Sequence, residues 1–338
     1  RALGAKRATE AIESFRTAFL DGAAGRGVAR DLAERVFEQL LAFGGYSFAR
    51  SHAAAFAVLV YRSAWLKRYH PAAFFSALLN NQPMGFWNSS VLVNEARRLG
   101  MAVFPADVHL SVAGCRPEGG GIRLGLSLVK GMGEEHVARF LEERERGTFA
   151  SLDDFCRRTR LGRRLVERLI LAGAMDGWGM PRRELLWELG LLSYEENALD
   201  MTWERDEVDL PPLSAAEAML AEQSVMGLSP GDHVMTFYRA RLRKRGVLGS
   251  RELATCPSGR HIRAAGLLVV HQSPPTAKGF HFLTLEDEDG MINVIVRPAV
   301  YERFRRVIRG AQLLLVEGDA QREGMISNLL ADKVTLLE

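Results

Sequence analysis

The sequence predicts a multidomain α+β chain that is mostly helical over its first part and ends in a five-stranded β-barrel. Two patterns support this class. Apolar residues recur at helical spacing early in the chain, whereas apolar and polar residues alternate in five short runs after residue 260. With 338 residues, 47% of them hydrophobic and 25% charged, the chain is globular and long enough for two or three domains.

Charge and cysteine usage limit the class of protein further. A formal net charge of +3 does not by itself indicate a polyanionic partner, so a nucleic-acid surface must come from local clustering of the 44 basic residues. Cys115, Cys156 and Cys256 are far apart without metal-ligand spacing, which predicts a reducing compartment and no structural zinc. Without a signal peptide or a membrane-spanning run, we expect a cytoplasmic location and no membrane partner.

The start of the chain combines small basic clusters with a helical pattern. Arg1, Lys6 and Arg7 surround Gly4, and a solvated face is the ordinary interpretation of such a cluster. Residues 28–43 carry apolar side chains on one face, which predicts an amphipathic helix. Because the sequence begins with Arg and not with Met, we expect it to be a piece of something longer.

The stretch Gly44–His70 predicts a glycine hinge followed by a long buried helix. Ser51 is a good N-cap, the run Ala53–Tyr61 is apolar, and Pro71 forces the chain to restart. A helix of about 19 residues is about 28 Å long, but its apolar run is too short to cross a bilayer.

Two basic side chains flank the N-terminus of this helix. Arg50 and His52 lie where the helix macrodipole is already positive, so an anion would relieve the conflict. With Ser51 and free backbone N–H groups they could hold a phosphate. Alternatively, Ser51 caps the helix, His52 bonds locally and Arg50 points into water. The residues alone favour the two interpretations equally.

Further helices and a small hairpin follow. Residues 71–79 and 90–99 predict two helices, the second closed by Gly100. Short apolar runs between residues 103 and 128 flank Glu118–Gly121, which predicts the turn of a hairpin.

Three motifs in this part of the chain resemble the fingers region of bacterial C-family DNA polymerases, the DNA polymerase III alpha subunits. They are RALGAKR at 1–7, FGGYSFARSHAAAFAVLVYRSAWLKRYHPAAFFSALL at 43–79 and EARRLGMAVFPADVHLS at 95–111. The loop NNQPMGFW at 80–87 is more similar to the error-prone, damage-inducible subgroup. The resemblance covers essentially the whole chain and implies helical fingers that bind the incoming dNTP. It assigns nucleotide binding to Arg1, Lys6, Arg7, Tyr46, Arg50, Ser51 and His52.

Lys130, Gly131 and Gly133 precede a predicted helix in the form of a helix-hairpin-helix. The two glycines allow a tight turn and close approach of the backbone to a DNA phosphate at the next helix N-terminus. Glu134 and Glu135 complicate this interpretation because they satisfy the same dipole and repel phosphate. A single motif of this kind is weak, and an ordinary helix connection is the alternative.

A second copy of the helix-hairpin-helix motif strengthens the interpretation of the first. A short helix begins at Ser151, a link follows at 160–162, and a second helix covers 163–172. Arg163 and Arg164 open that helix against its dipole, which favours phosphate binding over a solvated face. The pair resembles the tandem helix-hairpin-helix of the polymerase family, which grips primer–template duplex without reading sequence.

The acidic, proline-ended stretch Asp200–Pro212 predicts an exposed linker. Five basic residues between Arg239 and Arg245 could face DNA, although a solvated helix end is the default interpretation. Residues 223–227 match poorly the pentapeptide by which such polymerases bind the sliding clamp. Clamp contact is therefore expected to be weak or supplied by an accessory protein.

The end of the chain predicts an OB-fold. Five strands, with a helix over 299–308 between the third and fourth, have the OB-fold order; they cover 261–272, 280–288, 291–297, 313–321 and 325–337. Such barrels bind single-stranded template DNA on strands two and three. The candidates are Lys278, Phe280, His281, Asn293 and Arg297. A structural role is an equally good interpretation for each, and Phe280 shares a strand face with Phe282 that could be the inner one.

The resemblance implies a nucleotidyltransferase that needs Mg²⁺. In the family two Mg²⁺ ions are held by palm carboxylates, which would lie upstream of Arg1. We therefore expect no catalytic residue and no metal ligand in this chain, and no primer extension by it alone. The acidic run Glu286–Asp289 lies at a predicted hairpin turn and is no substitute.

Four domains are expected: fingers over 1–110, tandem helix-hairpin-helix over 111–199, acidic linker and basic helix over 200–250, and OB-fold over 251–338. The predicted function is the nucleotide- and DNA-binding part of an error-prone, translesion DNA polymerase at the bacterial nucleoid. A non-catalytic DNA-binding or repair module and a scaffold in a mutagenesis complex are the alternatives.

Overall fold

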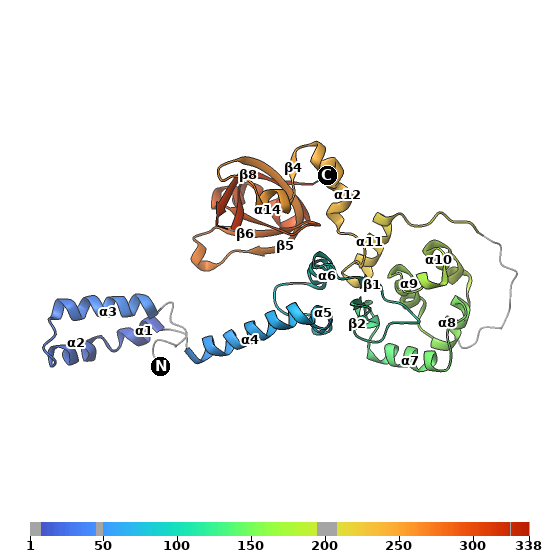
Figure 1. Ribbon diagram of the computed structural model, residues 1–338, viewed down its shortest axis with the longest axis horizontal. Helices are drawn as coiled ribbons and strands as arrows, with labels where there is room; N and C mark the ends of the chain where they lie inside the picture. Colours follow the sequence, from blue (N-terminus) through green and yellow to red (C-terminus); the bar gives the residue numbers. More distant parts are fainter. Residues whose placement is uncertain (1–7, 45–49, 195–207, 325, 338) are drawn as a thin grey trace. The chain divides into compact units, whose positions relative to one another are not determined.

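The computed structural model describes residues 8–44, 50–194, 208–324 and 326–337 (Figure 1). The chain divides into two compact units, residues 1–70 and residues 71–338. The four domain boundaries expected from the sequence stay predictions. Among the described residues, no helix is both long and apolar enough to cross a membrane.

Unit 1 is helical. Its small core lies around Ile12 and Phe37, between helices α1 (Ala8–Glu13), α2 (Arg16–Ala24) and α3 (Arg30–Gly44).

The long helix α4 (Arg50–Tyr69) confirms the helix expected from the sequence, but not its burial. Its large apolar side chains are exposed, with Phe56 at 51% and Tyr61 at 71%. An uninterrupted apolar run covers every side of a helix, a pattern typical of a buried helix. Burial also requires neighbouring elements on every side, and the described residues leave these side chains exposed.

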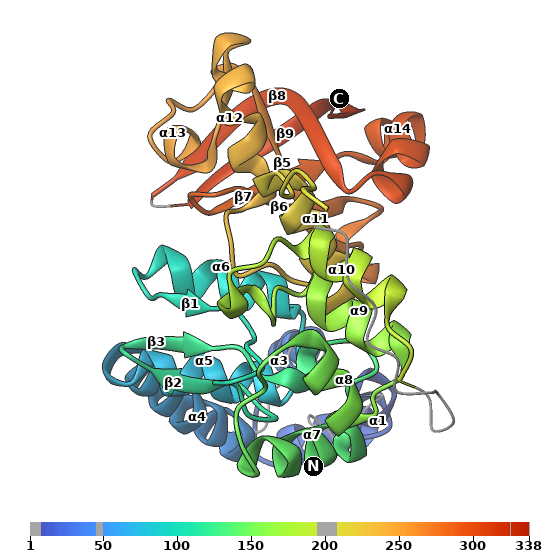
Figure 2. The ribbon, with the colours of Figure 1, turned by 90° about the vertical axis from the view of Figure 1, so that its right-hand side faces the viewer.

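The helical part of unit 2 packs around one apolar core that includes the fully buried Phe140, Phe155 and Leu169. Figure 2 shows its helices: α5 (Pro71–Asn80), α6 (Ser89–Arg98), α7 (Glu134–Glu145), α8 (Leu152–Thr159), α9 (Arg163–Leu171), α10 (Arg182–Leu191) and α11 (Ala215–Met226). The short helices η2 (Leu126–Leu128) and η3 (Asp176–Trp178) connect them.

A small sheet in this part confirms the predicted hairpin. Strand β2 (Arg116–Glu118) pairs antiparallel with β3 (Gly121–Arg123), and β3 also pairs in parallel with β1 (Val103–Phe104). The turn between β2 and β3 falls on Gly119 and Gly120, both at positive φ, where glycine is strongly favoured.

The end of unit 2 is a closed five-stranded barrel, as the sequence predicted. Strand β5 pairs with both β6 and β8, which closes the barrel, and β7 pairs in parallel with β9. This connectivity, with α14 (Pro298–Gly310) between the third and fourth strands, is that of an OB-fold. The strands are β5 (His261–Gln272), β6 (His281–Glu286), β7 (Met291–Val296), β8 (Leu313–Glu323) and β9 (Ile326–Leu336).

Shorter elements flank the barrel. Strand β4 (Val247–Leu248) extends the sheet beside β5, between helices α12 (Val234–Lys244) and α13 (Ser250–Ala254). The short helix η4 (Pro275–Ala277) lies between β5 and β6. Arg239 of α12, one of the five basic residues considered for DNA, is buried and pairs with Asp287 at 3.0 Å. It is therefore a structural residue of the barrel.

A buried carboxylate joins the barrel to α6. Glu286, at the end of β6, accepts hydrogen bonds from Asn94 at 3.1 Å and from Arg98 at 2.9 Å. The side chain of Glu286 is fully buried, so it is stable there only because these donors replace its hydration. The acidic run Glu286–Asp289 lies at the β6–β7 turn, as expected, and serves packing.

Candidate nucleic-acid interface

The first hairpin connects η2 to α7 and places bare backbone at a helix N-terminus. Gly131 has φ +91°, a conformation that side-chain-bearing residues rarely adopt, and the guanidinium of Arg168 donates to the Lys130 carbonyl at 2.8 Å. Gly133 is the N-cap of α7, and no side chain caps it. The first N–H groups of α7 therefore lack an intrahelical acceptor and are open to a ligand.

The second hairpin repeats this arrangement between α8 and α9. Gly162 is the N-cap of α9, again without a side-chain cap. In each hairpin a buried apolar residue, Met132 or Leu161, directly precedes the exposed glycine that begins the helix. The buried residue anchors the turn in the core while the glycine keeps the helix N-terminus accessible. By contrast, Ser151 caps α8 through its side chain.

The predicted phosphate ligands of the hairpins have different surroundings. Lys130 donates from Nζ to the Ser224 carbonyl at 2.6 Å, so it ties the first hairpin to α11. Arg163 donates to the carbonyl oxygens of Leu189 and Leu192, which closes the end of α10. Arg164 is exposed and bonds to no residue in the described part of the chain.

These surroundings predict opposite consequences for two neighbouring substitutions. Arg163→Ala leaves two main-chain carbonyls without their donor, and we expect unfolding to become easier by about 1–3 kcal/mol. Arg164→Ala is the matched control and should leave stability unchanged within about 0.5 kcal/mol. Urea unfolding followed by far-ultraviolet circular dichroism measures both, and equal stability of the two variants would contradict a structural role for Arg163.

The strand face expected to bind single-stranded nucleic acid carries Phe282 and not Phe280. Phe282 is 37% exposed on β6, opposite Ile295 of β7, whereas its neighbour Leu283 is buried inside the barrel. Phe280 precedes the strand. Asn293 of β7 is exposed on the same outer face as Phe282, since successive side chains alternate between faces.

The other barrel candidates are engaged with neighbouring side chains or lie in a turn. The ring of His281 stacks on Tyr301 with 3.4 Å between centroids. Burial, together with the charge of Arg309, lowers the pKa of His281, which disfavours the charged form that would attract a phosphate. Arg297 pairs with Asp332 at 2.6 Å, and Lys278 is exposed after η4 with φ +48°.

Comparison with known proteins agrees with this geometry. Residues 100–185 match the helix-hairpin-helix motif family. The error-prone DNA polymerase of Anaeromyxobacter sp. strain K is 40% identical over 100% of this chain and 31% of its own length. Over its whole length the chain is homologous to error-prone DNA polymerases. That of Pseudomonas aeruginosa is 39% identical over 99% of the chain and 33% of its own length.

The chain thus spans about a third of the length of these curated error-prone polymerases. Among solved structures, the crystal structure of asparaginyl-tRNA synthetase from Pyrococcus horikoshii aligns with 27% of this chain and 23% of its own, at 17% identity. Its TM-score is 0.23.

Most residues expected to bind the incoming nucleotide lie outside the described residues: Arg1, Lys6, Arg7 and Tyr46. Arg50 begins α4, and its side chain is also outside the description. Ser51 and His52 follow in the first, exposed turn, which contains no acidic residue, and the His52 ring packs on Phe56 with 4.5 Å between centroids. Nucleotide binding at this end stays a prediction.

One group of described side chains converges closely enough to approach a metal ion: His261, Asp319 and Asp332 on the barrel surface. It contains an imidazole, and one of its carboxylates already pairs with Arg297. Mg²⁺ in phosphoryl-transfer sites prefers carboxylate, phosphate and water oxygens. This cluster therefore does not fit the pair of Mg²⁺ ions that polymerases use.

Sequence reasoning missed a pocket lined by arginines behind the second hairpin. The run RRTRLGRR at 157–164 is its sequence signal, but Arg139 of α7 contributes to the lining from a separate element.

Proposed function

We propose that this chain is the nucleotide- and DNA-binding part of an error-prone, damage-induced DNA polymerase that carries out translesion synthesis in the bacterial cytoplasm, at the nucleoid. The observation that supports this most directly is the pair of uncapped helix N-termini at Gly133 and Gly162. The homology over the full chain supports the same family of activity.

The two hairpins hold the backbone of the primer–template duplex. Bare N–H groups at a helix N-terminus bind phosphate oxygens, and such contacts position DNA without reading its sequence. A polymerase that accepts damaged templates needs this kind of grip, because it must hold any sequence.

The barrel holds the single-stranded template ahead of the duplex. Phe282 offers an exposed ring on which a base can stack, and Asn293 lies on the same strand face. The dNTP is bound near the N-terminus of α4 by the residues around Ser51 and His52.

Nucleotide transfer requires Mg²⁺, which activates the primer 3′-oxygen and stabilises the leaving phosphate when bound by carboxylates. These carboxylates are assigned to the remainder of the full-length polymerase. The isolated chain is therefore inactive in primer extension, and sliding-clamp contact is weak or is made through an accessory protein.

Salt titration of DNA binding tests this proposal. The 338-residue chain should bind a fluorescein-labelled primer–template of any sequence, with log affinity falling against log salt by about 0.9 for each phosphate contacted. Fluorescence anisotropy between roughly 50 and 200 mM KCl measures the slope. Absence of salt-dependent binding would favour a scaffold role, and primer extension by the isolated chain with Mg²⁺ and dNTPs would refute the division of labour.

A further inference from the structure

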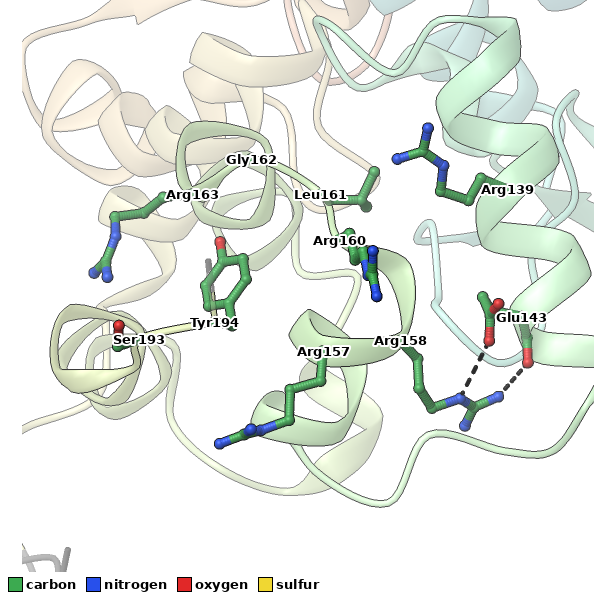
Figure 3. A pocket seen from close by; sticks show the side chains of 10 residues that line it. All are labelled: Arg139, Glu143, Arg157, Arg158, Arg160, Leu161, Gly162, Arg163, Ser193 and Tyr194. Carbon is green, nitrogen blue, oxygen red and sulfur yellow. Dashed lines mark hydrogen bonds and ion pairs between the residues drawn. The ribbon is translucent and has the colours of Figure 1, made fainter. Parts of the chain in front are cut away.

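The pocket behind the second hairpin carries a concentrated positive charge. It has a volume of about 930 Å³ and is lined by five arginines and a single carboxylate, Glu143 (Figure 3). That carboxylate already interacts with Arg158 and Arg146. Just outside the lining, Asp153 pairs with Arg157 at 2.9 Å and Asp154 pairs with Arg158 at 3.3 Å. The excess positive charge therefore comes mainly from Arg139 and Arg163, which form no ion pair with a described residue.

Two of the arginines in the lining are held in place by hydrogen bonds to main-chain carbonyls. Arg158 donates to the carbonyls of Gly147 at 2.9 Å and Thr148 at 3.1 Å, and its guanidinium lies 4.5 Å above the Phe149 ring. Arg163 is fixed by the end of α10. Held by main-chain carbonyls, these guanidinium groups keep their charge but lose little further conformational entropy when a ligand binds.

Another arginine is available to a ligand. Arg139 is exposed on α7 and bonds to no residue within the described ranges. Gly162, the uncapped start of α9, also lines the pocket. A free guanidinium and the positive end of a helix therefore face the same space, and both favour an anion with several acceptor oxygens.

The first hairpin has the opposite electrostatics. Its helix begins with Glu134 and Glu135, whereas the first turn of α9 contains no acidic residue and begins with Arg163 and Arg164. Carboxylates in the first turn satisfy the dipole of α7 and repel a phosphate. The two hairpins share a backbone shape, but the first turn of α7 attracts a phosphate less than the first turn of α9 does.

We propose that this arginine pocket holds phosphodiester groups of one DNA strand and is the main electrostatic anchor of the DNA, with the first hairpin making the weaker of the two hairpin contacts. The inference rests on the proposed function and assigns the phosphate contact within it. A pocket of this size exceeds a single phosphate and admits a strand segment, so consecutive phosphates of one backbone are the matching ligand.

The decisive variant is Arg139→Gln, which removes charge without breaking a contact between described residues. We expect affinity of the 338-residue chain for a labelled primer–template to fall by about tenfold near 100 mM KCl, and the salt slope to decrease by about one. Arg305→Gln on α14 is the matched control, because Arg305 is also exposed and bonds to no residue that the structure describes. It should change affinity less than about twofold.

A second variant, Arg160→Asn, tests the pocket independently, in case Arg139→Gln disturbs the local fold. Residue 160 has φ +50°, a conformation that asparagine tolerates better than most side chains. It should weaken DNA binding in the same direction as Arg139→Gln, with circular dichroism unchanged. Unchanged DNA binding by both variants, beside a steep wild-type salt slope, would overturn the pocket and leave the proposed function standing. If DNA binding by the wild-type chain showed no salt dependence, both the pocket and the proposed function would be overturned.

Competition separates DNA from free phosphates. Pyrophosphate and dATP should displace DNA only weakly, because they offer fewer linked phosphates to the pocket. If dATP instead binds the wild-type chain tightly, and Arg139→Gln weakens dATP binding without affecting DNA, the pocket is a nucleotide site and the DNA assignment is wrong.

Discussion

Replacing Asp287 by alanine should destabilise the barrel by about 3 kcal/mol or more. The carboxylate is fully buried at the β6–β7 turn and accepts from Arg239 at 3.0 Å and from the backbone N–H of Ser250 at 2.7 Å. It also accepts from the Ser250 hydroxyl and from the N–H groups of Asp289 and Gly290. Alanine leaves these donors without an acceptor and removes one partner of a buried guanidinium.

Asp289→Ala is the control for this effect. Asp289 pairs with Arg251 at 2.6 Å, but the Arg251 side chain is 79% exposed, so the pair contributes at most about 1 kcal/mol. Hydrogen exchange read by mass spectrometry on barrel peptides separates the barrel from the helical part. Exchange in β6 and β7 should accelerate strongly for Asp287→Ala and little for Asp289→Ala. Similar acceleration in both would show that the buried network is not what holds the turn.

The barrel could be predicted because apolar and polar residues alternate along its strands. Alternating apolar residues located the strands to within a few residues, and the helix between the third and fourth strands gave the order. The strand face on which each aromatic ring lies was harder to predict. The pairing register that sets Phe282 opposite Ile295 places Phe282 on the outer face, and a one-residue slip of this register would reverse every side chain of the strand.

The hairpins show the same limit for the site. The glycines at Gly131, Gly133 and Gly162 were identifiable from local chemistry alone, because tight turns require them. The role of Arg163 could not be predicted from local chemistry, because its partners Leu189 and Leu192 lie 26 and 29 residues further along the chain. The arginine pocket likewise depends on the packing of α7 against α8. Charge positions can be read from a sequence, but their partners depend on tertiary structure.

The second large effect is expected at Gly318, where β8 crosses close to β9. The strand pairing shifts register between Glu317 and Gly318. A Cβ at Gly318 would lie 2.0 Å from the carbonyl oxygen of Leu330 and 3.0 Å from the Cα of Ala331. Both are backbone atoms that cannot move without breaking the ladder. Gly318→Ala should therefore cost about 3 kcal/mol or more and open the closing strands of the barrel.

Gly310→Ala provides the matched substitution, because a Cβ there meets nothing within 4 Å at the end of α14. It should be neutral within about 1 kcal/mol. The barrel and the helical part have separate apolar cores, so Gly318→Ala should abolish binding of single-stranded DNA while duplex binding by the hairpins persists. Anisotropy with a labelled oligonucleotide and with a labelled duplex measures the two activities. Parallel loss of both would mean that the hairpins need the barrel to hold DNA; unchanged single-strand binding by an opened barrel would place that activity elsewhere in the chain.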